Sequence, residues 1–275
     1  MSQAALDNVV RLLDLEAMDV NIFRGVSPDE EHQRVFGGQV AGQALVAAAR
    51  TVGQGSVHSL HAYFLRPGDP KVPILYQVDR IRDGRSFTTR RVVAIQHGQA
   101  IFNLAASFHH DEDGFEWHMP LPEGVPSPES LPELKVRGDD RDRAIVMRFA
   151  EGSPLDRHHE VATRQLVWMR ADGVLPDNPL LHTCLLTYAS DLTLLDTTLL
   201  PHGTSSIDDT TMMASLDHAM WFHRPFRADS WFLYVQDTPS SSGGRGLARG
   251  TVFNRDGSLA ASVVQEGLIR KKRPS

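Results

Sequence analysis

Hydrophobic and polar positions along the first half of the chain predict one helix followed by four strands. In the segment 36–52, FGGQVAGQALVAAARTV, the apolar residues Val40, Ala44, Leu45 and Ala48 recur at helical spacing. The turn-forming sequences RPGDP, RDG and HGQ then divide the chain into short apolar runs. These runs, which we predict to be strands, span 58–65, 72–82, 86–97 and 100–109.

The second half of the chain follows the same order. The segment 180–197, LLHTCLLTYASDLTLLDT, predicts the helix. Predicted strands follow at 215–223, 230–236, 245–254 and 258–270. A long helix packed against an antiparallel sheet, twice over, is an α+β arrangement. The two sheets can join edge to edge, which would leave fewer exposed strand edges.

Matching residues indicate that the two halves are copies of one folding unit. The matched residues are Arg66 and Arg224, Tyr76 and Tyr234, and, after a one-residue slip, Gly98 and Gly257. The offset is 158 for the first two pairs (224 − 66; 234 − 76) and 159 for the third (257 − 98). A repeat of this length is typical of two supersecondary units in tandem.

Sequence rich in Pro, Glu and Asp separates the two copies. Residues 110–160 contain DEDG, PLPEGVPSPESLPEL and GDDRDR, which predict an irregular linker with some helix near 139–150. We therefore expect an N-terminal repeat over 1–110, a linker over 111–160 and a C-terminal repeat over 161–275.

Composition and charge narrow the classes of protein to consider. The net charge of −6 argues against a dedicated nucleic-acid binder, which would carry a basic face. The N-terminal segment reads as an amphipathic helix rather than a secretory signal, and no apolar run approaches the ~20 residues that span a bilayer. The single Cys184 fits a reducing compartment and, on an apolar helix face, is expected to be buried and unreactive. We expect a cytoplasmic protein with no nucleic-acid and no membrane partner.

Several polar clusters have simple structural explanations. Asp217 and His218 are neighbours on a predicted strand and face opposite sides, so we do not expect them to form an acid–base pair. The run HHDED at 109–113 lacks the spacing of a ligand set, and we expect no bound metal. His58 and His61 are expected to have structural roles in or beside their strand.

Six motifs, in this order, resemble the acyl-CoA thioesterase II (TesB-like) family: FGGQVAGQAL, HSLHAYFLRPGDP, RDGRSFTTRRV, YASDL, SLDHAMWFHRPF and DGSLAASVVQEGLIR. Members of this family have a double hot-dog fold and hydrolyse acyl-CoA thioesters to a fatty acid and coenzyme A, without a covalent acyl-enzyme. They commonly assemble as dimers or tetramers. The resemblance, which covers nearly the whole chain, implies the same fold and activity, an acyl-CoA substrate, no cofactor and a homo-oligomer.

The resemblance also implies three catalytic residues, because the family holds its attacking water with an Asp, a Thr or Ser, and a Gln. These are Asp191 in YASDL, Ser215 two residues before the aspartate of SLDH, and Gln265 in VVQEG. Some members have Thr where this chain has Ser215. The hydroxyl is kept, but the methyl group that restricts the rotamer is lost.

These residue types suit the hydrolysis of a thioester, whose carbonyl is already electrophilic. Asp191 can accept a proton from water, and partial burial would raise its pKa toward a useful value. Gln265 can donate and accept hydrogen bonds and so can orient a water, to which Ser215 adds a hydroxyl contact. Charge on the thioester oxygen needs backbone amides, which we expect at a helix N-terminus. Gly37 and Gly38 leave such amides accessible at the start of the first predicted helix.

The repeat predicts one active site per chain. At the offsets above, Gln265 aligns with Ala106 and Ser215 aligns with Val57, so the first copy lacks a polar side chain at two of the three positions. We therefore expect the second copy to carry the catalytic residues, with the first copy supporting them and lining the acyl tunnel.

The phosphates of coenzyme A require cationic side chains, and the sequence does not choose among the candidates. They are Arg85, Arg90, Arg91, Arg245 and Arg249. The glycine-rich GGRGLARG around the last two matches no nucleotide-binding fingerprint.

Two other functions remain open at this point: a hot-dog enoyl-CoA hydratase and a non-catalytic acyl-CoA-binding protein. A hydratase would need an Asp–His pair near the double bond, and no matching histidine follows YASDL. The presence of Asp191, Ser215 and Gln265 together argues against a binding protein that has lost turnover. The sequence contains no G-x-S-x-G motif, which argues against a serine hydrolase.

Overall fold

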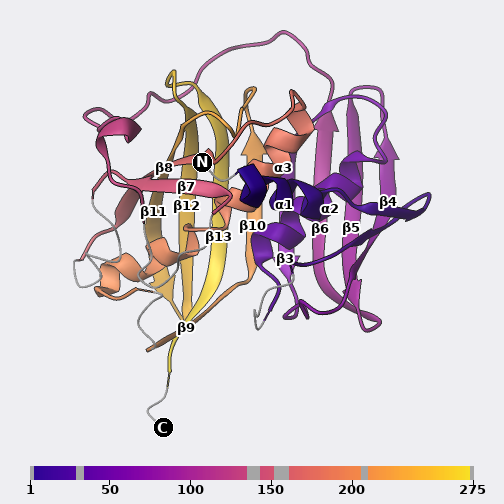
Figure 1. Cartoon of the computed structure of the whole chain (residues 1–275), viewed down its shortest axis with the longest axis horizontal. Helices are drawn as coiled ribbons and strands as arrows, with labels where there is room; N and C mark the ends of the chain where they lie inside the picture. Colours follow the sequence, from indigo (N-terminus) through magenta and orange to yellow (C-terminus); the bar gives the residue numbers. More distant parts are fainter. Residues whose placement is uncertain (1–2, 29–33, 135–142, 152–160, 206–209, 273–275) are drawn as a thin grey trace.

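The computed structural model describes residues 3–28, 34–134, 143–151, 161–205 and 210–272, which form a 13-stranded antiparallel sheet with the α-helices on one face (Figure 1). The first half contains α1 (Gln3–Leu13), β1 (Glu16–Asp19), β2 (Ile22–Gly25), α2 (Gly37–Ala49), β3 (Ser56–Phe64), β4 (Ile74–Asp83), β5 (Phe87–Gln96) and β6 (Gln99–His109). The second half contains the 3-10 helix η1 (Pro128–Ser130), β7 (Ile145–Phe149), β8 (Arg164–Ala171), α3 (Pro179–Ser190), the 3-10 helix η2 (Leu195–His202), β9 (Thr211–Ser215), β10 (Asp217–Phe222), β11 (Phe232–Ser242), β12 (Arg245–Asn254) and β13 (Leu259–Lys271). None of the described helices is long and apolar enough to cross a membrane.

The strand order joins the two halves edge to edge, as predicted. The order is β1-β2-β4-β5-β6-β3-β10-β13-β12-β11-β8-β7, with β9 also paired to β13. The indigo-to-magenta half and the orange-to-yellow half therefore meet at the β3–β10 pair in the middle of one continuous sheet (Figure 1). This architecture is the α+β double hot-dog that the sequence motifs imply.

The strand registers repeat with the offsets seen in the sequence. Val57 pairs with Phe108 in the first half, and Ser215 pairs with Gly267 in the second. These are the same positions of the repeat (215 − 57 = 158; 267 − 108 = 159). The register shift that follows Val57 in β3 corresponds to the break between β9 and β10. The two halves are therefore copies of one unit.

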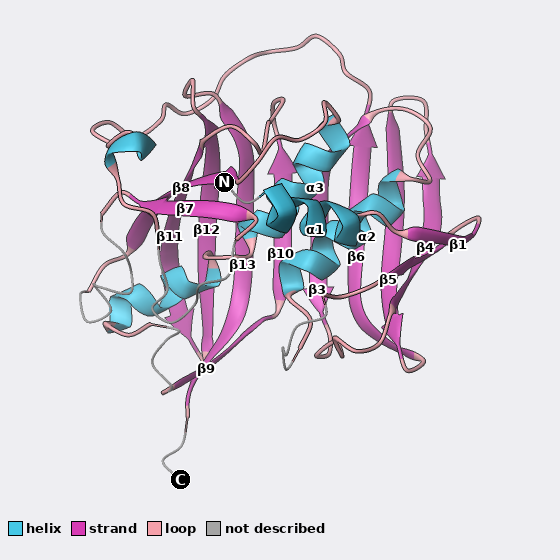
Figure 2. Cartoon of the chain, in the orientation of Figure 1, coloured by secondary structure: helices cyan, strands magenta, loops and turns pink. Residues whose placement is uncertain are grey.

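The helix α2, which is rich in Gly and Ala, packs against α3 on the covered face of the sheet (Figure 2). All residues of α2 from Gly38 to Ala48 are buried. A Cβ atom on Gly38 would lie only 2.4 Å from the carbonyl oxygen of Tyr188, and one on Gly42 would lie 3.3 Å from that of Cys184. Glycine at these two positions lets the backbones of the helices approach each other closely.

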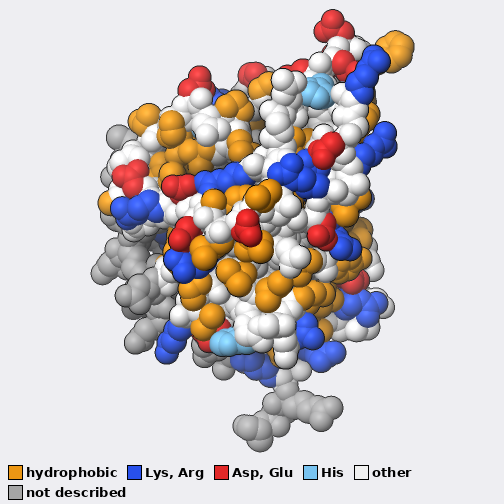
Figure 3. Space-filling model, turned by 90° about the vertical axis from the view of Figure 1, so that its right-hand side faces the viewer, with side chains coloured by type: hydrophobic (Ala, Val, Ile, Leu, Met, Phe, Trp, Pro, Cys, Tyr) orange, Lys and Arg blue, Asp and Glu red, His pale blue; other side chains and the backbone are white. Residues whose placement is uncertain are grey.

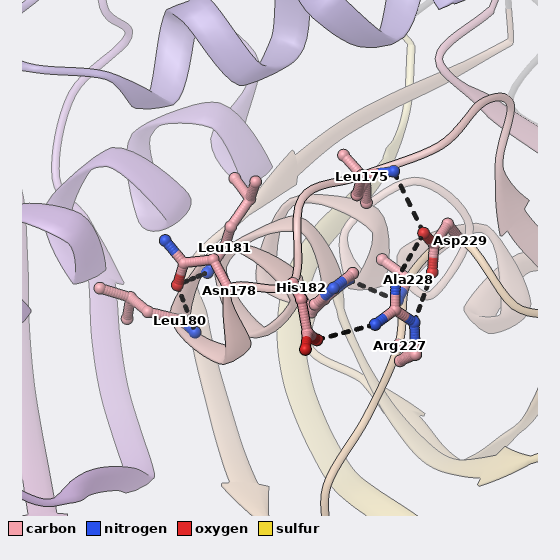
Figure 4. Close-up of polar contacts among 9 residues, drawn as sticks. Leu175, Asn178, Leu180, Leu181, His182, Arg227, Ala228 and Asp229 are labelled. Atoms are coloured by element: carbon pink, nitrogen blue, oxygen red, sulfur yellow. Dashed lines mark hydrogen bonds and ion pairs between the residues drawn. The ribbon is translucent and has the colours of Figure 1, made fainter.

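The start of α3 is held in place by polar contacts from two directions (Figure 4). The Asn178 side chain caps the helix by accepting hydrogen bonds from the backbone N–H groups of Leu180 and Leu181. His182 Nδ1 accepts a hydrogen bond from the backbone N–H of Ala228, which precedes β11. These contacts fix the position of α3 on the sheet and therefore the position of the residue at its other end.

The helix predicted over 180–197 is shorter in the structure. The α-helix ends at Ser190, and after a turn the chain continues as η2. The hydroxyls of Thr187 and Ser190 donate to backbone carbonyls one turn earlier, which weakens the helix at this point. Asp191 therefore lies at the C-cap of α3 and not inside a helix.

The expected helix near 139–150 is wrong where the structure describes it. Residues 145–149 form β7, which pairs with β8 at the end of the sheet. A short apolar run such as IVMRF is compatible with either a strand or a helix. Here it forms a strand because the edge of β8 provides backbone hydrogen-bond partners. Residues 139–142 lie outside the described part, and β8 is a strand that the sequence pattern did not predict. The division into 1–110, 111–160 and 161–275 stays a prediction.

The described part of the linker covers the second half of the sheet on the face opposite the helices. Leu121, Val125 and Leu131 pack against a buried cluster that includes Trp168 and Trp231. Apart from η1 and β7 this segment is irregular, as predicted. It is nevertheless part of the folded structure, because it removes these large aromatic side chains from water.

Candidate active site

The three residues named from the sequence motifs come together in the structure. Gln265 Nε2 donates to Asp191 Oδ1 at 2.6 Å and to Ser215 Oγ at 3.0 Å, and Ser215 Oγ lies 3.4 Å from Asp191 Oδ1. Asp191 follows α3, Ser215 ends β9, and Gln265 lies in β13. Segments separated by as many as 74 residues therefore meet at one point.

The N-terminus of α2 lies against the carboxylate of Asp191. The backbone N–H of Gly38 donates to this carboxylate, and a Cβ on Gly37 would lie 2.7 Å from Asp191 Oδ2 and 2.9 Å from the ring of Phe64. The positive end of the α2 dipole therefore stabilises negative charge here. The first half of the chain supplies this contact, so the site lies between the two halves. Of the accessible amides expected at Gly37 and Gly38, that of Gly38 binds the aspartate.

The environment of Asp191 makes its carboxylate a stronger base than an ordinary aspartate. Burial raises the pKa of Asp191 to about 6, while hydrogen bonds from Gln265, Gly38 and Ser215 act in the opposite direction. At neutral pH the carboxylate is therefore ionised but close enough to its pKa to accept a proton.

A cleft of about 860 Å³ opens beside this cluster. Asp191 and Ser215 line the cleft, whereas Gln265 is fully buried behind them. Phe64 and Tyr188 are among its apolar walls and come from the two different halves. The Asp191 carboxylate and the Ser215 hydroxyl can therefore contact a molecule in the cleft, and the Gln265 amide fixes the position of both groups through its hydrogen bonds.

Asp217 and His218 do not form an acid–base pair, as predicted. Asp217 accepts a hydrogen bond of 2.6 Å from the backbone N–H of Glu266, next to Gln265. His218 is buried, its Nε2 lies 2.8 Å from Ser190 Oγ, and burial lowers its pKa to about 4. Asp217 thus holds the backbone next to Gln265, and His218 contacts the side chain of the residue before Asp191.

The other side chains considered from the sequence lie away from the cleft. His58 Nε2 lies 2.8 Å from Ser107 Oγ, and the ring of His61 packs against Trp221. Cys184 is buried as predicted, and burial raises its pKa to about 12, which makes the thiol unreactive. Within the described ranges, no group of three or more His, Cys, Asp or Glu side chains is placed to hold a metal ion.

None of the five arginines considered for coenzyme A phosphates lines the cleft. Arg90 is fully buried and pairs with Asp83, which rules it out as a contact for an incoming anion. Three of the others form exposed ion pairs: Arg91 with Asp79, Arg245 with Glu266 and Arg249 with Asp237. The arginines that do line the cleft are Arg34 and Arg66. Neither was among the candidates from the sequence, although Arg34 lies two residues before the motif FGGQVAGQAL and Arg66 lies within HSLHAYFLRPGDP. These positions are the signal that could have found them.

Comparisons with known proteins found similar sequences and structures. A family described as acyl-CoA thioesterase matches residues 147–268, and one described as acyl-CoA thioesterase N-terminal domain matches residues 27–109. The chain is 41% identical to acyl-coenzyme A thioesterase 8 of Homo sapiens, over 96% of this chain and 89% of that protein. It is 39% identical to acyl-CoA thioesterase 2 of Haemophilus influenzae, over 96% and 98%. The crystal structure of acyl-CoA thioesterase II TesB2 from Mycobacterium marinum superposes with a TM-score of 0.83 at 46% identity, covering 96% of this chain and 98% of that one.

Proposed function

The chain belongs to the acyl-CoA thioesterase family and hydrolyses acyl-CoA thioesters to a fatty acid and coenzyme A, and we propose that Asp191, Ser215 and Gln265 carry out this hydrolysis. The observation that supports this assignment is the cluster in which Gln265 bonds both Asp191 and Ser215 at the wall of the cleft. No cofactor is needed, because water and a base suffice for a thioester.

In the proposed mechanism a water molecule bonded to Asp191 and Ser215 attacks the thioester carbonyl carbon. The Asp191 carboxylate takes one proton from this water, and a tetrahedral intermediate forms with negative charge on the former carbonyl oxygen. The positive end of α2 favours this charge. When the intermediate collapses, the carbon–sulfur bond breaks and the thiolate of coenzyme A leaves with the proton from Asp191. Gln265 keeps the carboxylate and the hydroxyl in place throughout.

The hydratase alternative has no support at the cleft. No histidine is found among the described residues that line it, and the buried His218 faces Ser190. The dehydratase domain of RzxB from Pseudomonas fluorescens and that of the CurJ module of curacin polyketide synthase superpose with TM-scores of 0.52 at 11% and 13% identity, which reflects the shared fold alone.

We further propose that the protein is cytoplasmic and forms a symmetric homo-oligomer. The end of the sheet carries exposed apolar side chains among charged ones (Figure 3), including Met18, Ile22, Leu75 and Ile81 on β1, β2 and β4. Because β1 is an edge strand, a second copy can cover both its edge and these side chains. Sedimentation analysis tests this assembly, and a monomer at micromolar concentration would contradict it.

A pre-steady-state experiment tests the proposed mechanism. Direct attack by water releases coenzyme A and fatty acid at the same rate, whereas an acyl-enzyme releases coenzyme A in a burst ahead of the acid. A single turnover in H₂¹⁸O, followed by mass spectrometry of the peptide that contains Asp191, adds an independent readout. Isotope in that carboxylate would mean attack by Asp191 itself and would overturn the mechanism.

A further inference from the structure

Two arginines line the cleft that holds the proposed catalytic residues. Arg34 lies just before α2, and Arg66 lies just after β3; both side chains are exposed. The backbone N–H of Val35 donates to the carbonyl of Gly68 at 3.0 Å and so ties the two segments together. The two guanidinium groups therefore stand on neighbouring stretches of chain at one cleft.

Each of these guanidinium groups is held by a backbone carbonyl and not by an acid. Arg34 Nη2 donates to the carbonyl oxygen of Met213 at 3.0 Å, and Arg66 Nη1 donates to that of Ala100 at 2.7 Å. Within the part of the chain that the structure describes, neither forms an ion pair. A guanidinium has five N–H donors, so each arginine keeps donors for a further partner while one contact restricts its position.

The rest of the cleft wall is largely apolar. Its side chains include Val40, Phe64, Ile101, Phe102, Leu192 and Leu216. Arg34 and Arg66 are the cationic side chains among the described lining residues, and the carboxylates there are Asp191 and Asp196. The cleft thus combines an apolar wall with a cationic pair, which fits a molecule with an apolar chain at one end and anionic groups at the other.

We propose that Arg34 and Arg66 bind the phosphate groups of the coenzyme A moiety. The proposal rests on the hydrolysis of acyl-CoA at Asp191. The planar guanidinium matches phosphate oxygens with two parallel hydrogen bonds, and such charge-assisted bonds are stronger than neutral ones. Contacts at the phosphates are remote from the thioester carbon, and they persist unchanged as the carbonyl is attacked. They therefore act on substrate binding and not on the chemical step.

The test compares two double variants on two substrates. Arg34→Gln/Arg66→Gln removes the proposed contacts, and Arg91→Gln/Arg249→Gln removes the same charge from two exposed ion pairs outside the cleft. The substrates are an acyl-CoA and the same acyl group on pantetheine, which lacks the phosphates. We expect the first variant to raise KM for acyl-CoA roughly 10-fold, with kcat within twofold and no change for acyl-pantetheine. The control variant should leave both substrates unchanged.

Two results would overturn the proposal. An unchanged KM for acyl-CoA would exclude a phosphate contact, and an equal change for both substrates would mean that Arg34 merely braces Met213 on the strand that carries Ser215. Calorimetry with free coenzyme A and with pantetheine gives a readout without turnover: only the affinity for coenzyme A should fall, again roughly 10-fold. Because this measurement does not involve catalysis, it remains valid if Asp191 proves not to be the base.

Discussion

The two halves of the sheet are built alike but differ at the positions where the proposed active site lies. Arg90 stands opposite Ala106 on β5 and β6, and Ala248 stands opposite Gln265 on β12 and β13. These are the same two positions of the repeat (248 − 90 = 158; 265 − 106 = 159). In both halves a large polar side chain lies opposite a small one. In the first half the large side chain is on β5, whereas in the second half it is on β13, the strand that corresponds to β6.

The side chains of Arg90 and Gln265 have different roles in the two halves. Arg90 Nε donates to Thr51 Oγ1 at 2.8 Å, two residues after the end of α2, and its guanidinium also pairs with Asp83. Gln265 instead bonds Asp191, one residue after the end of α3. In the first half the region after the helix therefore contains a buried guanidinium whose hydrogen bonds are made within the protein. In the second half the corresponding region contains the Asp191 carboxylate, which lines a cleft. This difference supports one active site per chain.

Features that both halves share serve the fold. Tyr76 and Tyr234 occupy the same position (234 − 76 = 158), both are fully buried, and each hydroxyl donates to the facing helix. The exposed pair of Asp79 with Arg91 recurs as Asp237 with Arg249 on the outer face. Contacts repeated in both copies therefore stabilise the unit, whereas contacts present in only one copy indicate function.

Asp191→Asn is expected to have the largest effect and tests the role of the second half in catalysis. We expect kcat for acyl-CoA to fall roughly 10²–10⁴-fold, because an amide cannot take a proton from water. Steady-state thiol release measures the rate, and circular dichroism with thermal unfolding checks that the fold is intact. Turnover within a factor of two of the parent would remove Asp191 from the mechanism.

Two matched variants, Gln265→Ala and Ala106→Gln, test the difference between the halves at one position of the repeat. Loss of the Gln265 amide should lower kcat roughly 10- to 100-fold, because Asp191 and Ser215 lose their common donor. Ala106 is buried, so Ala106→Gln should lower the free energy of unfolding by about 1–3 kcal/mol through overpacking and leave kcat within twofold. A large loss of kcat in Ala106→Gln would contradict the proposal of one site per chain.

The pH dependence of kcat/KM tests the environment of Asp191. Because burial raises the pKa of this carboxyl to about 6, its base form disappears as the pH falls through that value. We expect kcat/KM to drop about tenfold for each pH unit below 6. An ordinary aspartate would keep the rate constant down to about pH 4. A midpoint near 4 in the measured profile would show that Asp191 is not shifted or is not the base.

Arg90→Ala probes the half without the proposed site. Removal of this buried guanidinium leaves a cavity and unpaired acceptors around Thr51, so we expect the free energy of unfolding to fall by about 2–4 kcal/mol. The KM and kcat of the folded enzyme should stay within twofold. Denaturant titration and thiol release measure the two quantities, and a selective loss of kcat would assign Arg90 a part in catalysis.

The smallest effects are expected at the repeated ion pairs. Arg91→Gln and Arg249→Gln each remove an exposed pair, and each should change the free energy of unfolding by less than about 1 kcal/mol. Their closely similar environments predict nearly equal values. Denaturant titrations that differ by more than about 1 kcal/mol would mean that the two outer faces are not equivalent.

Much of the architecture can be predicted from local sequence patterns. Strand alternation, turn residues and the 158-residue offset locate most strands of both halves and the helix α2, because these signals depend on neighbours in the chain. The secondary-structure predictions are wrong where tertiary contacts determine the local structure. The run 145–149 becomes a strand only because the edge of β8 is available to it. The helix before Asp191 ends early, and the carboxylate of Asp191 binds Gly38 and Gln265 from other segments.

From the sequence it follows that the chain is a tandem repeat whose second copy carries Asp191, Ser215 and Gln265, and that the first copy has no polar side chain at the positions of Ser215 and Gln265. The tertiary structure alone decided that these three meet, that the N-terminus of α2 lies on the carboxylate of Asp191, and that Arg34 and Arg66 stand at the same cleft. The physical reason is that side-chain types and their periodicity are local properties of the chain. Burial, hydrogen-bond partners and the pKa of a carboxyl depend on residues that are distant in sequence and become neighbours only after folding.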